Sequence, residues 1–369
     1  MGRIVAGLSW PFALKLWLAI LAVVLLAAGA ASGAETIQTS AQHAVLIDGN
    51  TGTVLFEKNA RSLMEPLSLT KLMTAEVLFD QIKKGKLTLD QQFVISKNAW
   101  RRGGAPSRGS KMFAAVNSHV AISDLISGLI VDSGNDAAIA IAEGVAGSEA
   151  GFAELMTRHA RELGLQASTF INPTGAPDPG QRVTALEIAI VALHIVKAYP
   201  DLYPFFSEKE FTWSKIRQLN RNPLLTMDIG GDGLMTCSVA EPGLGLVGSA
   251  IQNGRRMIVV VSGVAAEKDR ASESRKLIDY GFRAFEEQEL FPAGAVISAA
   301  SVYGGEKSAV DLRADGPVRV LIQRGQRERL TAKLIYNGPL KPPVSAGTEI
   351  GTLRIFEGDA AILDVPLYA

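Results

Sequence analysis

Two β-hairpin patterns that lie far apart in the sequence constrain the fold of this chain most strongly. The segment AVLIDGNTGTVLFE, residues 44–57, holds two β-rich runs around the turn Gly49-Asn50-Thr51-Gly52. Residues 243–264 hold two more runs around Gln252-Asn253-Gly254, and Asn-Gly is typical of a tight hairpin turn. Much of the chain between them has apolar residues at helical spacing. We therefore expect an α/β (α+β) domain whose antiparallel sheet takes strands from both ends of this region and is flanked by helices.

Apolar periodicity and end signals predict the helices. His159 lies on the apolar stripe of one of them, so we interpret it as a core histidine with satisfied hydrogen bonds. The Gly, Pro and Ser content of residues 101–110 predicts a loop. The expected helices cover residues 67–85, two stretches within 125–146 joined by a turn at 132–136, 152–163, about 184–198 and 270–286.

A change in composition near Phe291-Pro292 indicates a second domain. From there to Ala369 the chain shows short strand-like runs, such as VRVLIQ and IGTLRIFEG, separated by Gly and Pro turns. A length of 369 residues is enough for about two domains. We expect a main domain over residues 35–291 and a small all-β domain over residues 292–369.

The first 34 residues are typical of an export signal. Arg3 and Lys15 supply positive charge, residues 16–31 are apolar, and Ser32-Gly33-Ala34 offers small residues for cleavage. An uncleaved membrane anchor is the alternative, because the apolar run is close to membrane-spanning length. Cleavage is favoured because the run ends in Ala and Gly. Either reading predicts an exported, periplasmic protein, attached to the outer face of the inner membrane if the signal stays uncleaved.

Composition indicates a globular protein, argues against one class of partner, and shows whether disulfides can stabilise the fold. Apolar residues make up 47% and charged residues 20%, which is typical of a globular protein. Lys+Arg and Asp+Glu both total 37, so the balance of charge argues against a nucleic-acid partner. Cys237 is the one cysteine, so the chain has no internal disulfide and carries a free thiol.

Three kinds of site are disfavoured by context. Residues 243–248 match G-x-G-x-x-G, but a hairpin follows where a dinucleotide site needs a helix. The four histidines are dispersed without metal-ligand spacing, and the chain lacks the G-x-S-x-G sequence of a nucleophile elbow. We expect neither a metal nor another cofactor. The histidines are His43, His119, His159 and His194.

Two short motifs point to nucleophilic chemistry. In Ser68-Leu69-Thr70-Lys71 the serine and the lysine lie three residues apart, so they share a helix face and the amine can act as a base toward the hydroxyl. The helix dipole near an N-terminus favours the neutral lysine, and N–H groups there can face an oxyanion. Ser133-Gly134-Asn135 supplies a second hydroxyl and an amide in a turn between helices. This order of motifs is typical of penicillin-recognising serine enzymes.

The sequence resembles the low-molecular-weight penicillin-binding proteins, which are serine-type D-alanyl-D-alanine carboxypeptidases of the S11 type. The resemblance spans nearly all of the chain after residue 34 and rests on PLSLTKLMT, LIVDSGNDAAIAIAEG, FINPTGAPDPGQRVTALEIA and DGLMTCSVAEPGLGLVGSA. It implies a serine β-lactamase/transpeptidase-like domain followed by the family's C-terminal β domain. It also implies peptidoglycan pentapeptides as substrates and β-lactam antibiotics as inhibitors.

The resemblance assigns a role to each matched residue. Ser68 would attack the carbonyl between two D-alanines, Lys71 would take its proton, and Ser133 would relay a proton to the leaving D-alanine. Asn135 would bind the substrate amide. The terminal carboxylate would contact Thr236 and Arg270, and the N–H groups of Ser68 and Ser238 would form the oxyanion hole.

The third motif departs from the family pattern. Met235 stands where the family has a lysine, and Cys237 stands where it has a glycine. Met235 in place of the lysine removes a cation from a substrate-binding position. This loss should raise the pKa of Lys71 and slow the reaction. Family members often continue into a basic amphipathic helix, and this sequence ends at DVPLYA. We therefore expect a soluble exported protein that contacts the membrane only if the signal is uncleaved.

Three functions remain open at this point. The first is an acyl-serine carboxypeptidase, slowed by the changes at Met235 and Cys237. The second is a non-catalytic peptidoglycan-binding or regulatory homologue. The third gives Cys237 a functional thiol, although a small, partly buried strand residue is the simpler interpretation.

Overall fold

The computed structural model describes residues 37–237, 243–325 and 329–369. Its main sheet has the strand order β2-β1-β10-β9-β7, with β8 also pairing with β9, and the pairings are antiparallel. The sheet therefore joins the first hairpin of the chain to the strands near residue 250, as the two hairpin patterns predict. The strands are β1 (His43–Asp48), β2 (Val54–Lys58), β7 (Gly231–Gly233), β8 (Thr236–Cys237), β9 (Leu244–Gln252) and β10 (Arg255–Val264).

Both faces of this sheet are buried. On β10, Ile258 and Val260 pack into the larger core beneath most of the helices. Met257 and Val259 belong to a second core with Leu277 of α8. Because successive strand residues point to opposite faces, this double burial explains the apolar run RRMIVVVSGV.

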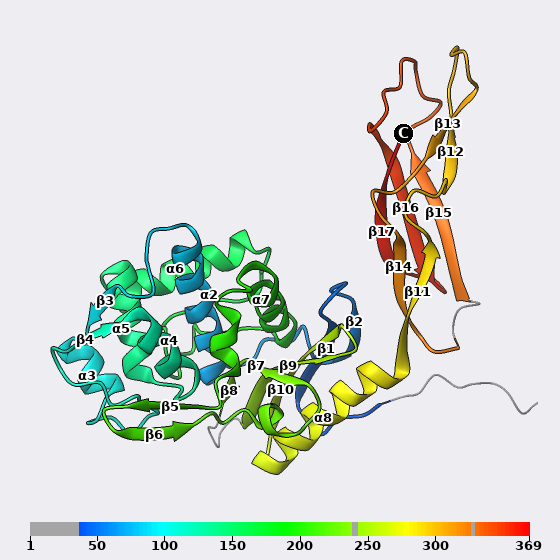
Figure 1. Ribbon diagram of the computed structural model, residues 1–369. Helices are drawn as coiled ribbons and strands as arrows, with labels where there is room; N and C mark the ends of the chain where they lie inside the picture. Colours follow the sequence, from blue (N-terminus) through cyan, green and yellow to red (C-terminus); the bar gives the residue numbers. More distant parts are fainter. Residues whose placement is uncertain (1–36, 238–242, 326–328) are drawn as a thin grey trace, which may run out of the picture.

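Helices cover the two faces unequally, as Figure 1 shows. The helix α8 packs on β9 and β10 from one side, and α7 packs on β1 and β10. At the centre of the helical layer is α2, whose residues from Thr70 to Phe79 are all buried, as expected of a helix enclosed by others. The α-helices are α2 (Thr70–Lys83), α3 (Lys97–Gly103), α4 (Ile122–Ile130), α5 (Asn135–Ala146), α6 (Glu149–Glu162), α7 (Ala185–Ala198) and α8 (Glu267–Ala284). Short elements join them: η1 (Leu67–Leu69), η2 (Tyr203–Ser207), η3 (Pro223–Thr226), β3 (Gln92–Val94), β4 (His119–Ala121), β5 (Glu210–Trp213) and β6 (Ile216–Leu219).

The C-terminal part is built from strands around its own core, and it projects from the end of α8 in Figure 1. The sheet pairings are β11 with β14, β12 with β13, and β15-β16-β17. Its strands are β11 (Phe285–Phe291), β12 (Ser298–Ser301), β13 (Ala309–Leu312), β14 (Val318–Gln323), β15 (Leu330–Tyr336), β16 (Glu349–Glu357) and β17 (Ala360–Tyr368).

The architecture confirms the predicted fold class, a mixed domain with an antiparallel sheet flanked by helices and a small all-β region after it. The boundary drawn from composition at 291/292 stays a prediction. Strand pairing favours an earlier position, because β11 (Phe285–Phe291) lies before that boundary and pairs with β14. The expected signal segment, residues 1–34, lies outside the described residues.

One local prediction is wrong in part. Residues 101–110 were expected to be a loop, yet Arg101–Gly103 form the last turn of α3. The Ser96 hydroxyl accepts a hydrogen bond from the Ala99 N–H and caps that helix, and the Gly103-Gly104 pair ends it.

None of the helices among the described residues is long and apolar enough to cross a membrane.

Candidate active site

Ser68 sits in a single turn of 3₁₀-helix, η1, immediately before α2. The expected continuous helix over 67–85 is therefore two elements, and Ser68 precedes the α-helical part. In a 3₁₀ turn, side chains three residues apart eclipse, which keeps Ser68 and Lys71 on one side. Leu67 has a φ of +48°, a strained value for a branched residue, and such strain gathers at functional positions.

Lys71 is almost completely buried, with 1% of its surface exposed. Its Nζ donates a hydrogen bond to the carbonyl oxygen of Thr174 at 2.7 Å. Burial lowers the pKa of Lys71 to about 7, with Cys237 and Asp136 acting to raise it and the charge of Arg221 acting to lower it further. About half of the amine is therefore neutral at neutral pH, as a general base requires.

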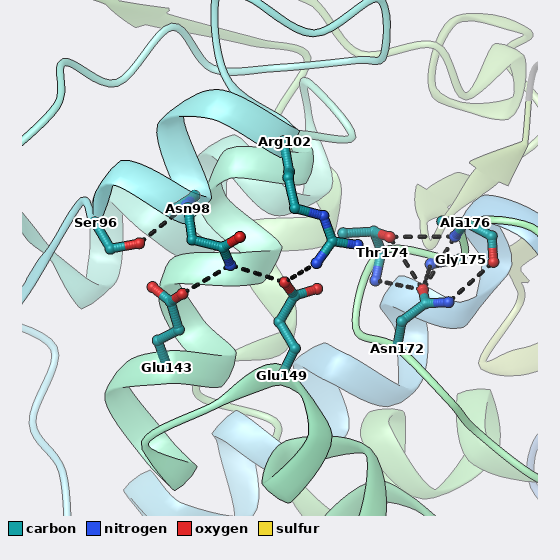
Figure 2. Close-up of polar contacts among 10 residues, drawn as sticks. Ser96, Asn98, Arg102, Glu143, Glu149, Asn172, Thr174, Gly175 and Ala176 are labelled. Atoms are coloured by element: carbon teal, nitrogen blue, oxygen red, sulfur yellow. Dashed lines mark hydrogen bonds and ion pairs between the residues drawn. The ribbon is translucent and has the colours of Figure 1, made fainter.

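The carbonyl that binds Lys71 belongs to a tight turn organised by Asn172 (Figure 2). The Oδ1 of Asn172 accepts hydrogen bonds from the N–H groups of Thr174, Gly175 and Ala176, at 3.2, 2.8 and 3.0 Å. It also accepts from the Thr174 hydroxyl, and its Nδ2 donates to the Ala176 carbonyl. One side chain thus fixes the orientation of the turn that faces Lys71.

Gly175 brings the same turn against the nucleophile. Its φ is +81°, and a Cβ placed there would lie 1.8 Å from the Leu67 carbonyl oxygen. Only glycine accommodates both the backbone conformation and this approach. The turn therefore packs directly on the residue before Ser68.

Ser133 and Asn135 lie in the turn between α4 and α5. Ser133 is buried and has a φ of +52°, and Asn135 is the first residue of α5. The Asn135 N–H donates to the Ser110 carbonyl at 2.9 Å. The Asp136 carboxylate accepts from the N–H of Met112 at 2.9 Å, so the segment after α3 is held against this turn.

The third motif forms β8, a short strand that pairs with β9 and packs on η1. Met235 and Cys237 are buried in the same apolar cluster as Leu67 and Leu69. Because side chains alternate along a strand, Thr236 faces the opposite way from both of them. Met235 therefore contributes packing where the family pattern has a charge.

Arg270 supports this strand from α8. It is 3% exposed, and its two Nη atoms donate to the carbonyls of Cys237 at 3.1 Å and Arg221 at 3.3 Å. Burial lowers its pKa. Ser238, expected to supply an oxyanion N–H, lies outside the described residues.

Several residues near the site were not predicted from the sequence. Arg221, after β6, donates from Nη1 to the Ser110 hydroxyl at 2.9 Å. Asp132 precedes Ser133, is 1% exposed, and has Gln218, Asp136 and Arg221 close enough to its carboxylate to act on its pKa. Burial raises the pKa of Asp132 to about 7, with Asp136 adding to the effect and Arg221 opposing it. The position of an acidic residue directly before the S-x-N motif is the one sequence signal that could have found Asp132.

The geometry thus brings the three motifs together around Ser68, through the contact of β8 with η1 and the electrostatic influence of Asp136, Cys237 and Arg221 on Lys71. The roles of Ser68, Lys71, Ser133, Asn135, Thr236 and Arg270 stay predictions. Among the described residues, no group of three or more His, Cys, Asp or Glu side chains is placed to hold a metal ion.

Comparisons with known proteins agree with this architecture. Residues 30–266 match the peptidase S11 family, D-alanyl-D-alanine carboxypeptidase, and residues 285–369 match the penicillin-binding protein 5 C-terminal domain. The chain is 38% identical to D-alanyl-D-alanine carboxypeptidase DacC of Escherichia coli, over 90% of this chain and 84% of that protein. It is also 38% identical to DacA of Haemophilus influenzae, over 86% of this chain and 81% of that protein. The crystal structure of penicillin binding protein 5 from Haemophilus influenzae superposes with a TM-score of 0.82 at 36% identity, covering 91% of this chain and 98% of that one.

Proposed function

Because the chain belongs to the D-alanyl-D-alanine carboxypeptidase family, peptidase S11, and is a serine enzyme of this class, we propose that it removes the terminal D-alanine of peptidoglycan pentapeptides through an acyl-enzyme at Ser68. The observation that carries the proposal is Lys71, a buried lysine with a pKa near 7, three residues from a half-buried serine at a strained turn. A neutral amine in that position can accept the proton of the attacking hydroxyl.

The reaction follows from the arrangement of the motifs. The Ser68 oxygen attacks the carbonyl between the two D-alanines while its proton passes to Lys71. When the peptide bond breaks, Ser133 relays a proton to the leaving amine, and an ester joins Ser68 to the remaining peptide. Water then hydrolyses this ester with the same groups, which regenerates the serine.

Asn135 and Thr236 complete the proposed substrate contacts. Asn135 binds the amide of the acyl part, and Thr236, on the face of β8 away from the core, binds the terminal carboxylate. The N–H groups of Ser68 and Ser238 receive the oxyanion. Turnover is proposed to be slower than in enzymes with a third-motif lysine, because loss of one preorganised polar group costs about 2.7–4 kcal/mol of transition-state stabilisation.

β-Lactams should acylate the same serine. Penicillin-binding protein D2 from Listeria monocytogenes, 25% identical with a TM-score of 0.60, has been solved in an ampicillin-bound form. A peptidoglycan substrate also requires an extracytoplasmic site of action. We therefore propose that the protein is exported, with membrane contact only if the N-terminal segment is retained.

The test combines a labelled penicillin with a pentapeptide assay. We expect a covalent adduct on Ser68, identified by mass spectrometry of the digested protein, and release of D-alanine from the pentapeptide. Ser68→Ala should lose both, and Lys71→Met should lose both while remaining folded. Absence of a wild-type adduct after long incubation would overturn the acyl-enzyme and favour a non-catalytic peptidoglycan-binding homologue.

A further inference from the structure

A cavity outside the three motifs opens beside the segment that leads to the nucleophile. Its volume is about 680 Å³, which is within the range of small-ligand sites. Leu63, Glu65, Pro177, Arg182 and Ser262 are among the residues that line it. None of these five side chains takes part in the proposed acyl transfer, so the cavity can serve a different purpose.

Two walls of this cavity continue directly into the surroundings of Ser68. Glu65 lies three residues before Ser68, so their Cα atoms are at most about 11 Å apart. Pro177 follows the turn of Gly175, where a Cβ would lie 2.9 Å from the Ser68 nitrogen. The cavity is therefore within reach of a peptide that is attached to Ser68.

A third wall connects the cavity to the third motif. Ser262 of β10 pairs with Gly245 of β9, and Gly245 in turn pairs with Cys237 of β8. Neighbouring strands lie about 4.8 Å apart, so this wall begins two strands away from the motif. The cavity thus borders the same end of the sheet as the proposed substrate site.

The lining of the cavity combines an apolar surface with one charge of each sign. Leu63 is 56% exposed and Pro177 is exposed, which is unusual for an apolar side chain unless a ligand covers it. Glu65 and Arg182 are both half-buried, and Arg182 Nη1 lies 3.4 Å from Glu65 Oε1. A chain of methylene groups that ends in an amine and a carboxylate would complement this lining.

The ion pair leaves both of its members able to bind such a ligand. A separation of 3.4 Å is longer than a charge-assisted hydrogen bond, and pairs this exposed to water are weak. Arg182 Nη1 also donates to the carbonyls of Asp178 and Gln181, which hold the guanidinium in place. In the part of the chain that the structure describes, its Nη2 and Nε donate to no other group, so both can donate to a carboxylate.

We propose that this cavity binds the side chain of the residue before the two D-alanines, a diamino acid whose side chain ends in both an ammonium and a carboxylate. Glu65 pairs with the ammonium, Arg182 pairs with the carboxylate, and the methylene groups lie against Leu63 and Pro177. Such a side chain ends about 10 Å from the carbonyl that Ser68 attacks, which agrees with the separation of Ser68 and Glu65. The inference rests on the proposed function, since it specifies which stem peptides the same site prefers.

The experiment uses three pentapeptides that differ only at the end of this side chain. The first carries the ammonium and the carboxylate, the second has a carboxamide in place of the carboxylate, and the third has an acetylated amine. The wild type should prefer the first peptide over either of the others by roughly 5- to 20-fold in kcat/KM. Arg182→Gln should lose the discrimination against the carboxamide and keep that against the acetylated amine, and Glu65→Gln should do the reverse.

Two controls separate the cavity from the chemistry at Ser68. Benzylpenicillin lacks the diamino acid, so both variants should be acylated within about twofold of the wild-type rate. Arg61→Gln is the matched variant, because Arg61 forms an exposed ion pair with Glu57 at the same distance of 3.4 Å and does not line the cavity. It should keep the full preference for the first peptide.

Equal kcat/KM values for the three peptides in the wild type would overturn the inference, as would a preference that Arg182→Gln and Glu65→Gln leave unchanged. Equal losses for all peptides and for penicillin would show a merely structural role and overturn it too. If the wild type releases no D-alanine and forms no adduct, the acyl-enzyme proposal fails on its own. Calorimetric binding of the three peptides to the wild type and to both variants then decides the inference, and equal affinities would refute it.

Discussion

The Nζ of Lys71 lies 2.7 Å from the carbonyl oxygen of Thr174, so a turn about a hundred residues away in sequence orients the base beside Ser68. A main-chain carbonyl accepts a hydrogen bond from either protonation state of the amine. The contact therefore holds Lys71 in place before and after it takes a proton.

The first prediction concerns the pH dependence of acylation. The pKa of Lys71 is lowered to about 7, and only the neutral amine can accept the Ser68 proton. The second-order rate of labelling by penicillin should therefore rise about tenfold per pH unit below 7 and level off above it. Circular dichroism over the same range serves as the folding control. A rate that stays flat from pH 5 to 9 would contradict a Lys71 base.

The second prediction concerns the turn in Figure 2. Asn172→Ala should slow acylation about tenfold or more, because the Thr174 carbonyl loses its orientation. Asn172→Asp keeps the accepting oxygen and should do less harm. Stability should fall by roughly 1–3 kcal/mol in the alanine variant, measured by urea unfolding.

Asn98 offers the matched control for this prediction. It is also half-buried and donates from Nδ2 to Glu143 and Glu149, both at 2.9 Å. Asn98→Ala should lose comparable stability with acylation unchanged. Equal effects of the two variants on acylation would mean that the Asn172 turn acts only through general stability.

The third prediction uses two glycines with nearly equal backbone angles. Gly175 has a φ of +81° and a Cβ would collide with the Leu67 carbonyl, whereas Gly164 has a φ of +82° with nothing within 4 Å. Gly164→Ala should cost only about 1–2 kcal/mol from the left-handed conformation. Gly175→Ala should cost more than about 3 kcal/mol and abolish labelling of Ser68. Similar unfolding midpoints for the two variants would refute the close approach.

The fourth prediction concerns a buried polar cluster behind the site. The Glu76 Oε1 accepts hydrogen bonds from His159 at 3.0 Å, His194 at 2.9 Å and Tyr199 at 2.8 Å. Burial alone would raise the pKa of Glu76, but these bonds outweigh it, and the pKa lies below the usual 4.5. Burial alone would lower the pKa of His159, but the bond and charge of Glu76 and the nearby Glu162 outweigh it, and the pKa lies above the usual 6.5.

The two shifts define a pH window. The stabilisation from Glu76 is complete above pH 4.5 and is lost as the pH falls through its lowered pKa. That from His159 is complete below pH 6.5 and is lost as the pH rises through its raised pKa. Glu76→Gln should lower the free energy of unfolding by roughly 1–3 kcal/mol between these values and flatten its pH dependence. The exposed Glu154 on α6 gives the control, Glu154→Gln, and a parallel pH profile for all three proteins would contradict the prediction.

Patterns that are local in sequence predicted most of the fold. The hairpin turns, the end of the helix over 152–163, the start of the helix near Thr184 and the core position of His159 follow from periodicity and capping, and the structure confirms them. The resemblance located the motif segments, which the structure brings together. Residues that act through main-chain contacts escaped prediction. Asn172 and Thr174 work through the geometry of a turn, and the loop of Arg221 lies beside the third motif only because Arg270 donates to the carbonyls of both Arg221 and Cys237. No short sequence pattern encodes such long-range contacts.

Arg270 holds the third motif by carbonyl oxygens, which every residue type carries. The main-chain position of the third motif therefore does not depend on the identity of the side chains at positions 235 and 237. Side chains at these two positions can therefore change while the Arg270 contacts that hold the main chain are kept. Inhibitors that bind through an ammonium group at the third motif would therefore meet a main chain held in place by Arg270, with the apolar Met235 in place of that group.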